Sequence, residues 1–522
     1  MTPPLLIEQP VRYHEDASEL FRTLGALTST DAILLESADI TTKSGLSSLG
    51  VITASLRLTC TGQDVRAEAL TPSGEHAVAL LRDKLADSIV RADAPAPTTA
   101  VTFRFPASNA ADEHERLVAT STVAPLRILQ AALPDALLAG GFAFDYLGTF
   151  EDLPPVAPGA NTYPDYQFVL AEIVLDINHR TREAVLRAMA LGEAEGGDVD
   201  KQVRELATRC EQPAPVDDAQ PKAPAGATVT ARAQVSDTDF CRHVEHLKDN
   251  IEAGDIYQVV PARAFTMDCP DAYRAYRQLR RTNPSPYMFY VRGLDSDGTP
   301  YELFGASPES NLKFAAHNRR LELYPIAGTR PRGLNPDGSV NEELDIRNEL
   351  ELRTDAKEIA EHTMLVDLAR NDLARVAAPG TRRVAALMAV DRYSRVMHLV
   401  SRVTATLAAG LDALDAYRAC MNMGTLTGAP KLRAMELLRG VEQHRRGSYG
   451  GAVGYLRGGG DMDTCIVIRS AFVTGGTAVV QAGAGVVRDS QPAAEADETL
   501  AKAYAVLHAI ALAADAELEV IR

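Results

Sequence analysis

The sequence predicts an α+β fold built on large antiparallel sheets. Strand-like runs recur along the chain, and several are separated by tight turns such as RGGGD (457–461) and TGGT (474–477). Such turns join antiparallel hairpins, whereas strict alternation of strands and helices would indicate a parallel sheet. The chain has 522 residues, of which 46% are hydrophobic, and this is ample for a large core. Together these observations favour the α+β class.

A low-complexity segment divides the chain. Residues 211–228, EQPAPVDDAQPKAPAGAT, are rich in Pro, Ala and Asp and cannot form a core, so we expect an exposed linker. It separates an N-terminal region, residues 1–210, from a C-terminal domain, residues 229–522. In the N-terminal region we expect strands over residues 32–37, 101–105, 140–148 and 166–177 and a helix over residues 76–90.

The C-terminal domain begins with a predicted helix that Ser236 or Asp237 can cap and that ends at Gly254. Predicted strands follow over residues 256–265, 286–293, 321–328, 396–407, 449–456, 463–473 and 477–487. We expect further helices over residues 354–372, 431–440 and 491–510. Pro430 belongs to the first turn of the second of these, a position that tolerates a missing N–H group.

Composition and charge exclude several classes of protein. The formal net charge is −17 and no basic run offsets it, which argues against nucleic acid as a partner. The six cysteines are scattered without a Cys-x-x-Cys pair, so we expect reduced thiols rather than disulfides or a zinc site. No secretion signal or membrane-spanning run is apparent, so we expect a cytoplasmic protein without membrane contact. Nucleotide-binding loops and a Gly-x-Ser-x-Gly elbow are also missing from the sequence.

Two Glu-x-x-Glu pairs are the strongest chemical signal in the chain. Glu358 and Glu361 lie in one predicted helix, and Glu495 and Glu498 lie in another far downstream. A spacing of three puts each pair on one helix face, where the charges repel unless a cation such as Mg²⁺ lies between them. The alternative is a pair of solvated helix faces. Just before the second pair, Gly483 and Gly485 end a predicted strand, where bare backbone N–H groups can approach an anion.

Five other residues are candidates for a site that binds a carboxylated substrate. Arg469 lies in an apolar strand and can bind a carboxylate, or it can form a structural ion pair. Tyr449 is flanked by glycines and either donates to a ligand or simply packs. His398 interrupts an apolar run as a proton carrier or a core residue, and Glu309 is a general acid if desolvated. Lys502 follows Glu498 by four residues, which allows an i,i+4 ion pair.

Several segments together resemble the chorismate-utilising enzyme family, and they cover most of residues 236–514. They are GASPES, PIAGTRPRG, RTDAKEIAEHTMLVDLARNDLARV, YSRVMHLVSRV, MNMGTLTGAPKLRAMELL, RRGSYGGAVGY, DTCIVIRS and QAGAGVVRDSQPAAEADET. The resemblance implies an α/β/β/α sandwich of antiparallel sheets, with the N-terminal region packed onto the chorismate domain. Within the family, the segments are most similar to the large subunits of anthranilate synthases.

One position separates the branches of this family. Relatives that hydroxylate the ring, and aminodeoxychorismate synthases, carry Lys in a PIKGT motif, whereas this chain has Ala327 there. Alanine is neither base nor nucleophile, so the resemblance favours direct amination of chorismate by ammonia and loss of pyruvate to give anthranilate. That reaction is the first step of tryptophan biosynthesis and is inhibited by tryptophan. The alternatives are an aminodeoxychorismate synthase, an aminodeoxyisochorismate synthase and a non-catalytic regulator that binds tryptophan.

The resemblance also implies a role for each motif residue. Glu361 and Glu498 hold Mg²⁺, with Glu358 and Glu495 in support. Glu309 is the general acid and His398 assists pyruvate elimination, while Tyr449 and Arg469 hold the enolpyruvyl carboxylate. The remaining substrate contacts are Gly328, Thr329, Gly483, Ala484 and Gly485.

Two further segments, LLES (34–37) and NPSPYMFY (283–290), are similar to the inhibitory tryptophan site of these enzymes. The similarity implies that Ser37, Pro286, Tyr287 and Met288 contact tryptophan and that Glu36 faces its amino group.

The resemblance also implies a link between sites and a partner protein. In YGGAVGYL, period-two spacing puts Tyr449, Val453 and Tyr455 on one strand face, with the last two toward the tryptophan site, so this strand would couple the two sites. The chain contains no recognisable glutaminase. We therefore expect a separate glutamine amidotransferase subunit that supplies ammonia, in a heterotetramer of two large and two small subunits.

Overall fold

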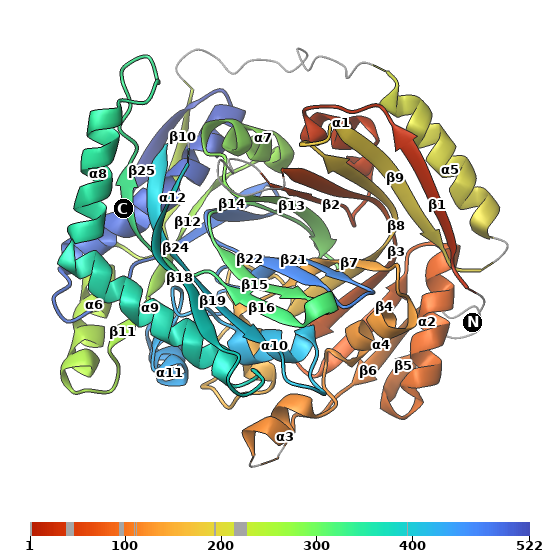
Figure 1. The fold of residues 1–522 in the computed structure, drawn as a ribbon, viewed down its shortest axis with the longest axis horizontal. Helices are drawn as coiled ribbons and strands as arrows, with labels where there is room; N and C mark the ends of the chain where they lie inside the picture. Colours follow the sequence, from red (N-terminus) through yellow and green to blue (C-terminus); the bar gives the residue numbers. More distant parts are fainter. Residues whose placement is uncertain are drawn as a thin grey trace.

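The computed structural model describes residues 3–37, 46–92, 99–108, 110, 112–192, 195–212, 227–393 and 395–522. Strands cross the centre of the molecule and helices line its outside (Figure 1). Two long strands, β3 (Ser47–Thr61) and β8 (Tyr166–Asn178), pair along nearly their whole length. The first half of β3 continues into one series of strands and its second half into another. The fold is therefore two antiparallel sheets that share their longest strands.

The first series of strands runs from the N-terminal strand to the C-terminal one. Its order is β1 (Leu5–Val11), β9 (Glu183–Ala190), β8, β3, β2 (Ile33–Glu36), β13 (Tyr287–Leu294), β14 (Pro300–Ser307), β23 (Ser470–Thr474), β24 (Thr477–Gly483), β12 (Ala262–Asp268), β10 (Thr228–Ala233) and β25 (Glu517–Ile521). All of these pairs are antiparallel except β10 with β25. Because β2 pairs with β13, strands from residues 1–210 and 229–522 share one sheet.

The second series of strands forms the other sheet of the sandwich. Its order is β5 (Ile89–Ala92), β6 (Ala100–Arg104), β4 (Asp64–Ala69), β3, β8, β7 (Leu137–Phe142), β21 (Ala452–Arg457), β22 (Met462–Ile466), β15 (Ser310–Ala315), β16 (Arg320–Leu323) and β19 (Val396–Thr406). Strand β19 also pairs with β17 (Ile326–Pro331) and β18 (Arg383–Arg392). A separate short ribbon joins β11 (Gln258–Val259) to β20 (Gly428–Ala429).

Helices cover the outer faces of both sheets. The first sheet packs against α1 (Ala17–Thr23), α5 (Glu195–Cys210), α7 (Ala272–Thr282) and α12 (Pro492–Ala513). The second packs against α2 (Pro72–Lys84), α4 (Ala124–Ala132), α9 (Ala356–Ala374) and α10 (Ala413–Cys420). Helices α6 (Asp237–Glu252) and α11 (Lys431–Glu442) pack together in a smaller hydrophobic cluster. The remaining helices are α3 (Glu113–Val118) and α8 (Glu342–Thr354), which are not part of this cluster. Four short 3₁₀ turns among the described residues are η1 (Ala26–Thr28), η2 (Ala86–Ser88), η3 (Phe144–Thr149) and η4 (Ala316–Asn318).

Apolar side chains fill the space between the two sheets. Phe289, Leu303, Val453 and Phe472 are all at most 1% exposed in this layer. Burying a large apolar side chain contributes roughly 1.5–3 kcal/mol, so the inter-sheet layer is a main source of stability. With helices outside both sheets, the predicted α/β/β/α sandwich is confirmed. Among the described residues, no helix combines the length and the hydrophobicity needed to span a membrane.

Three predicted strands split at prolines or at strained backbone, and two others, 140–148 and 477–487, end earlier than expected. The run 256–265 splits into β11 and β12 before Ala262, and 321–328 splits into β16 and β17, because Pro261 and Pro325 lack a ladder N–H. The run 463–473 splits into β22 and β23 near Arg469, whose φ is 50°. In 140–148 the strand ends at Phe142 and a 3₁₀ turn follows.

Two predicted helix boundaries also shift. The helix expected over 76–90 begins at Pro72 and ends at Lys84, and residues from Ile89 form a strand. Pro430 precedes α11 as its cap rather than lying in its first turn. The cap of α6 is Ser236, as expected. Most of the predicted linker, residues 213–226, lies outside the described residues, and Thr228 already begins β10.

Candidate active site

Helices α9 and α12 bring the two glutamate pairs together. The Asp355 side chain caps α9 by accepting from the amides of Lys357 and Glu358, which fixes the start of the helix. Burial raises the pKa of Glu361, and the charges of Glu358 and Glu498 raise it further. Burial and the Glu498 charge act in the same direction on Glu495 and raise its pKa. Glu361 therefore lies close enough to Glu498 for their charges to repel, although the two come from distant parts of the sequence.

The carboxylate set has the chemistry that a hard divalent cation needs. All the donors are oxygens, and Glu495 Oε2 is buried without a hydrogen-bond partner. Protein cations hold two of the four carboxylates, because Arg330 lies 3.0 Å from Glu358 and Lys502 lies 2.6 Å from Glu498. Within the described part of the chain, no three Asp, Glu, His or Cys side chains stand ready to hold an ion. The residues fit a metal, and these ion pairs would have to open to admit it.

The end of β24 supplies bare backbone beside this cluster. A Cβ on Gly485 would lie 3.6 Å from Glu361 Oε1, and one on Gly483 would lie 3.2 Å from the Tyr449 hydroxyl. The glycines therefore let the main chain approach both the carboxylates and the tyrosine. The N–H of Ala484 donates to the Pro261 carbonyl at 3.1 Å, so this amide is already bonded. The contact of Ala484 with substrate stays a prediction.

A neutral histidine faces a threonine across two strands. Thr329 on β17 lies opposite His398 on β19, and Thr329 Oγ1 is 2.9 Å from His398 Nδ1. Burial, together with the charge of Arg469, lowers the pKa of His398 to about 4. The imidazole is therefore uncharged near pH 7 and can accept a proton. Gly328, which directly precedes Thr329, has a φ of 88°, and a Cβ there would lie 3.2 Å from Glu358 Oε2.

Glu309 is a buried acid between β14 and β15. Its exposed fraction is 7%, and the Thr425 hydroxyl donates to Oε1 at 3.2 Å. Burial raises the pKa of Glu309 to about 8 against the opposing effect of the Thr425 hydrogen bond. This carboxyl therefore carries its proton near neutral pH, as a general acid must.

Arg469 and Tyr449 lie at breaks in the strands rather than within them. Arg469 follows β22, and its Nη1 donates to the Lys502 carbonyl at 3.2 Å. Burial lowers the pKa of this guanidinium, and burial raises the pKa of the Tyr449 phenol to about 12. Both groups remain hydrogen-bond donors near neutral pH. Arg469 lies close to Tyr449, Glu498 and His398, so the site combines residues from β19, β22–β23, α12 and the turn before β21.

The expectation that Tyr449 shares a strand face with Val453 and Tyr455 is wrong. Strand β21 begins at Ala452, and Gly450 before it has a φ of 79°, which turns the chain out of the extended conformation. Tyr449 packs in the core under the second sheet, whereas Val453 and Tyr455 belong to the layer between the sheets. Period-two spacing applies only inside a continuous strand.

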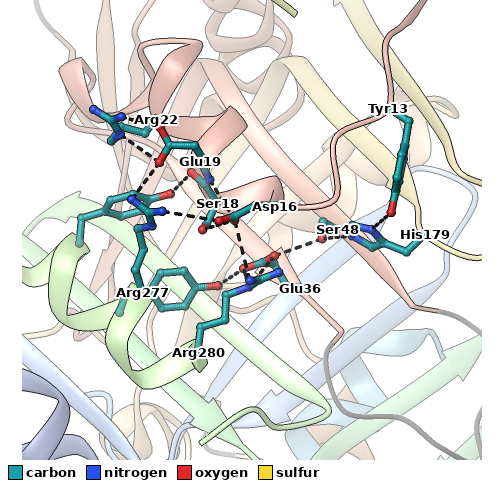
Figure 2. A network of polar contacts seen from close by, with 12 residues as sticks. Tyr13, Asp16, Ser18, Glu19, Arg22, Glu36, Ser48, His179, Arg277 and Arg280 are labelled. Atoms are coloured by element: carbon teal, nitrogen blue, oxygen red, sulfur yellow. Dashed lines mark hydrogen bonds and ion pairs between the residues drawn. The ribbon is translucent and has the colours of Figure 1, made fainter. Parts of the chain in front are cut away.

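A second polar site surrounds Glu36 at the end of β2 (Figure 2). Glu36 is 4% exposed and accepts hydrogen bonds from Tyr276, Arg280 and Ser48, the last two at 3.1 Å and 3.3 Å. Burial raises the pKa of Glu36. His179 Nε2 contacts Ser48 Oγ at 2.9 Å and so extends the network. The carboxylate predicted to meet an amino group is thus already paired with a guanidinium.

The residues predicted to bind tryptophan lie on strands of both sheets, and those of the first sheet lie on both of its sides. Met288 lies opposite Glu36 in the β2–β13 pair, and its side chain packs with the helix side of the sheet. Tyr287, Val453 and Tyr455 pack toward the layer between the sheets, and the Tyr287 hydroxyl donates to Asp463 at 3.4 Å. The other two predicted residues lie at strand ends. Ser37 follows β2 and its N–H donates to the Ser47 carbonyl at 2.8 Å, and the buried Pro286 precedes β13. Their contacts with tryptophan stay a prediction.

Comparison with known proteins identifies the family. The family model for chorismate binding enzymes matches residues 86–508, which is most of the chain. The chain belongs to the chorismate-binding enzyme family. The family assignment, the α+β fold and an enzyme activity on chorismate agree with the site geometry described above.

Several curated relatives of this chorismate-binding enzyme are similar over nearly their whole length. "Anthranilate synthase component 1" of Vibrio cholerae is 49% identical over 98% of this chain and 97% of its own, and that of Escherichia coli is 48% identical over 97% and 96%. Among solved structures, anthranilate synthase component I from Streptococcus pneumoniae is 26% identical, has a TM-score of 0.66 and covers 90% of this chain and 93% of its own. The menaquinone-specific isochorismate synthase of Escherichia coli is 19% identical with a TM-score of 0.64, over 98% and 96%, which shows the shared fold.

Sequence reasoning missed three residues of this chorismate-binding enzyme. Thr425 donates to Glu309, and its signal was the polar TLTG run in an apolar region. Arg330, the residue after Thr329, pairs with Glu358. Gln258 interrupts the apolar run IYQVVP, its Oε1 is buried without a partner, and its Nε2 lies 3.1 Å from the Cβ position of Gly485.

Proposed function

We propose that this chain is the large subunit of an anthranilate synthase, which aminates chorismate with ammonia and eliminates pyruvate to give anthranilate. The observation that carries the proposal is the similarity to proteins called anthranilate synthase component 1, at 45–49% identity over nearly the whole chain in several bacteria. A site with a protonated acid, a neutral imidazole and clustered carboxylates supports this reaction class.

Ala327 supports amination without a lysine. It lies on β17 directly before Gly328 and Thr329, and its carbonyl is 3.1 Å from His362 Nδ1. Its methyl group can neither deprotonate water nor attack the ring. Attack by ammonia needs neither, so this position favours an anthranilate synthase over an aminodeoxychorismate synthase.

Glu309 and His398 divide the acid and base work between them. Glu309 carries a proton near pH 7 and would donate it to the ring hydroxyl as that group leaves. Neutral His398, oriented by Thr329, would accept the ring proton whose loss accompanies pyruvate elimination. Two groups whose surroundings shift their pKa values in opposite directions are typical of an acid–base pair.

Cationic and hydrogen-bonding groups would orient the substrate. Arg469 and Tyr449 would hold the enolpyruvyl carboxylate, because both donate and both lie beside the carboxylate cluster. Thr329 and the bare backbone at Gly483 and Gly485 would bind the other oxygens. Fixing the substrate in this way lowers the entropic part of the barrier.

The metal proposal assigns Mg²⁺ to Glu361 and Glu498, with Glu358 and Glu495 in support. Bound there, Mg²⁺ would neutralise the substrate's ring carboxylate. We expect Glu498→Ala to abolish turnover and Mg²⁺ dependence, measured as anthranilate formation against Mg²⁺ concentration. Asp497→Ala is the matched control, because Asp497 is on the same helix but pairs with Arg522 and is 67% exposed. Near-normal activity in Glu498→Ala would contradict the metal assignment.

Feedback and assembly belong to the same proposal. Tryptophan would bind near Glu36, Ser37, Pro286, Tyr287 and Met288 and inhibit the enzyme, with Val453 and Tyr455 beneath. A glutamine amidotransferase would supply ammonia, since the relatives' name, component 1, implies a second component. We expect two copies of each subunit in the assembly.

Anthranilate fluorescence tests the proposed function directly. The purified chain is incubated with chorismate, Mg²⁺ and ammonium, with and without tryptophan. We expect fluorescence that grows with time and that tryptophan suppresses. Chorismate loss without fluorescence would indicate a sibling enzyme that stops at an aminated, non-aromatic product. No chorismate loss with ammonium or with an added glutaminase subunit would favour a regulator without catalytic activity.

A further inference from the structure

Lys502 makes a contact at the active site that a surface ion pair does not require. It lies one turn after Glu498 on α12, and its Nζ is 2.6 Å from Glu498 Oε1. The same Nζ donates to the Gly483 carbonyl at 3.0 Å, at the strand end that approaches the carboxylate cluster. A free helix-surface pair contributes little and has no reason to reach across to another element. The two contacts hold the ammonium between α12 and β24.

The Lys502 charge acts on the other carboxylates of the site as well. Burial raises the pKa of Glu309, Glu361 and Glu495, and the Lys502 ammonium opposes that rise in each of them. Lys357 does the same for Glu361 and Glu495 only. Lys502 therefore acts on more carboxylates of the site than Lys357 does.

We propose that Lys502 is a resident counter-ion of the carboxylate cluster, and that its ammonium leaves Glu498 when a divalent cation binds there. The inference rests on the proposed metal-binding function and deepens it. An ammonium at 2.6 Å occupies the Oε1 position that a metal would use, and two cations on one oxygen repel each other.

Exchange of cations links metal binding to substrate binding. Releasing Glu498 leaves an ammonium without its partner beside Gly483, and the carboxylates of chorismate would take its charge. Metal and substrate then favour each other, because each removes a cost of binding the other. The free enzyme would bind metal weakly, and chorismate would strengthen that binding.

Titration with Mn²⁺ tests the exchange without measuring activity. Mn²⁺ shares the oxygen preference of Mg²⁺, and its free concentration is read by electron paramagnetic resonance. Without chorismate, we expect Lys502→Met to bind Mn²⁺ on the order of tenfold more tightly than the wild type, because no ammonium competes for Glu498. We also expect chorismate to improve the affinity of the wild type more than that of Lys502→Met.

Two matched variants separate direct contact from general charge. Lys357→Met removes a positive charge that acts on the same cluster, and we expect its affinity to change by less than about threefold. Lys502→Arg keeps the charge and should retain the affinity of the wild type. Thermal unfolding of each variant reports whether the fold is intact, and if Lys502→Met does not fold, Lys502→Gln replaces it.

The outcomes distinguish the two proposals. Unchanged or weaker Mn²⁺ binding in a folded Lys502→Met variant, or a gain that Lys357→Met matches, would overturn the counter-ion inference alone. A wild type that binds no Mn²⁺, with or without chorismate, would overturn the proposed metal function together with this inference. A metal-loaded crystal structure in which Nζ remains within ion-pair distance of Glu498 would also contradict the exchange.

Discussion

At the scale of single residues, the site separates an acid from a base by their surroundings. Glu309 is buried with one hydroxyl as its partner, so its pKa rises to about 8. His398 is half-buried and close to Arg469, and desolvation and that charge lower its pKa to about 4. Neither side chain carries a charge at pH 7, and each can exchange the proton that its proposed step requires.

The Thr425 hydroxyl tunes the proton affinity of Glu309. Only the protonated acid can donate, so activity should be present below about pH 8 and be lost as pH rises through the pKa. The hydrogen bond favours the ionised form, and Thr425→Val should therefore raise the pKa and move the alkaline limb of kcat to higher pH.

Thr425→Ser is the control for that prediction, since it retains the hydroxyl and should keep the limb of the wild type. The pH dependence of kcat is measured by anthranilate fluorescence for all three proteins. A limb that stays in place, or moves to lower pH, in Thr425→Val would remove Glu309 as the titrating acid.

His398 is expected to act after amination. His398→Met removes the proton acceptor, so anthranilate formation should fall by about 100- to 10,000-fold while chorismate is still consumed. Mass spectrometry of the reaction should show the aminated, non-aromatic intermediate. A normal yield of anthranilate from this variant would exclude His398 from the mechanism.

At the scale of secondary-structure elements, α7 ties the site around Glu36 to the rest of the fold. Tyr276 and Arg280 both reach Glu36 from α7, one turn apart on the same helix face. The other side of this helix packs on α12, and Arg274 of α7 pairs with Asp515 at 2.9 Å. Helix α7 therefore contacts both the predicted tryptophan site and the helix that carries Glu495, Glu498 and Lys502.

Removing Arg280, the cation paired with Glu36, should destabilise the protein in a pH-dependent way. Arg280→Met leaves the buried Glu36 carboxylate without its ion pair and should cost about 2 kcal/mol of unfolding free energy. The folded-state pKa of Glu36 already lies above its ordinary value. The contribution of Glu36 to the free energy of unfolding therefore falls as pH rises from the ordinary pKa to the folded-state pKa. The variant raises that pKa further, and the loss should be larger at pH 8 than at pH 6.

Urea unfolding at both pH values measures this effect. Arg281→Met is the control, because Arg281 is the next residue on α7 but bonds to Gln278 at an exposed position. Equal losses at the two pH values would show that Glu36 is not the group that responds.

At the scale of the whole molecule, Arg446 joins segments that are far apart in the sequence. This side chain is 2% exposed and donates to the Leu426 and Val260 carbonyls at 2.8 Å and 2.7 Å. It also pairs with Glu442, and its guanidinium lies 4.4 Å from the ring of Phe144. These partners include the neighbours of Thr425 and Gly483, so one buried cation supports several parts of the site.

Arg446→Met should therefore destabilise the fold strongly. It leaves the half-buried Glu442 without its cation and two carbonyls without donors, and the expected loss is about 3–5 kcal/mol of unfolding free energy. Urea unfolding measures it, with Arg433→Met on the exposed side of α11 as the control. A loss below about 1 kcal/mol would show that Arg446 is not a structural link.

The fold class and the family could be predicted because both depend on local patterns. Hairpin turns indicated antiparallel sheets, the spacing of Glu358 and Glu361 put both on one face, and PIAGT identified the family branch. The strand break at Arg469 could not be predicted, because its positive φ depends on packing around it, whereas the breaks at Pro261 and Pro325 carry a local signal. The face on which Tyr449 lies was predicted wrongly because the chain turns at Gly450, before β21 begins.

The sequence by itself determined which residues can donate, accept or bind a cation, because those properties belong to the side chains. Only the tertiary structure decided their protonation and partners. Burial puts the proton on Glu309 and removes it from His398, and chain contacts place Lys502 on Glu498 and Arg280 on Glu36. These are long-range effects of desolvation and charge, which arise only when distant segments are brought together.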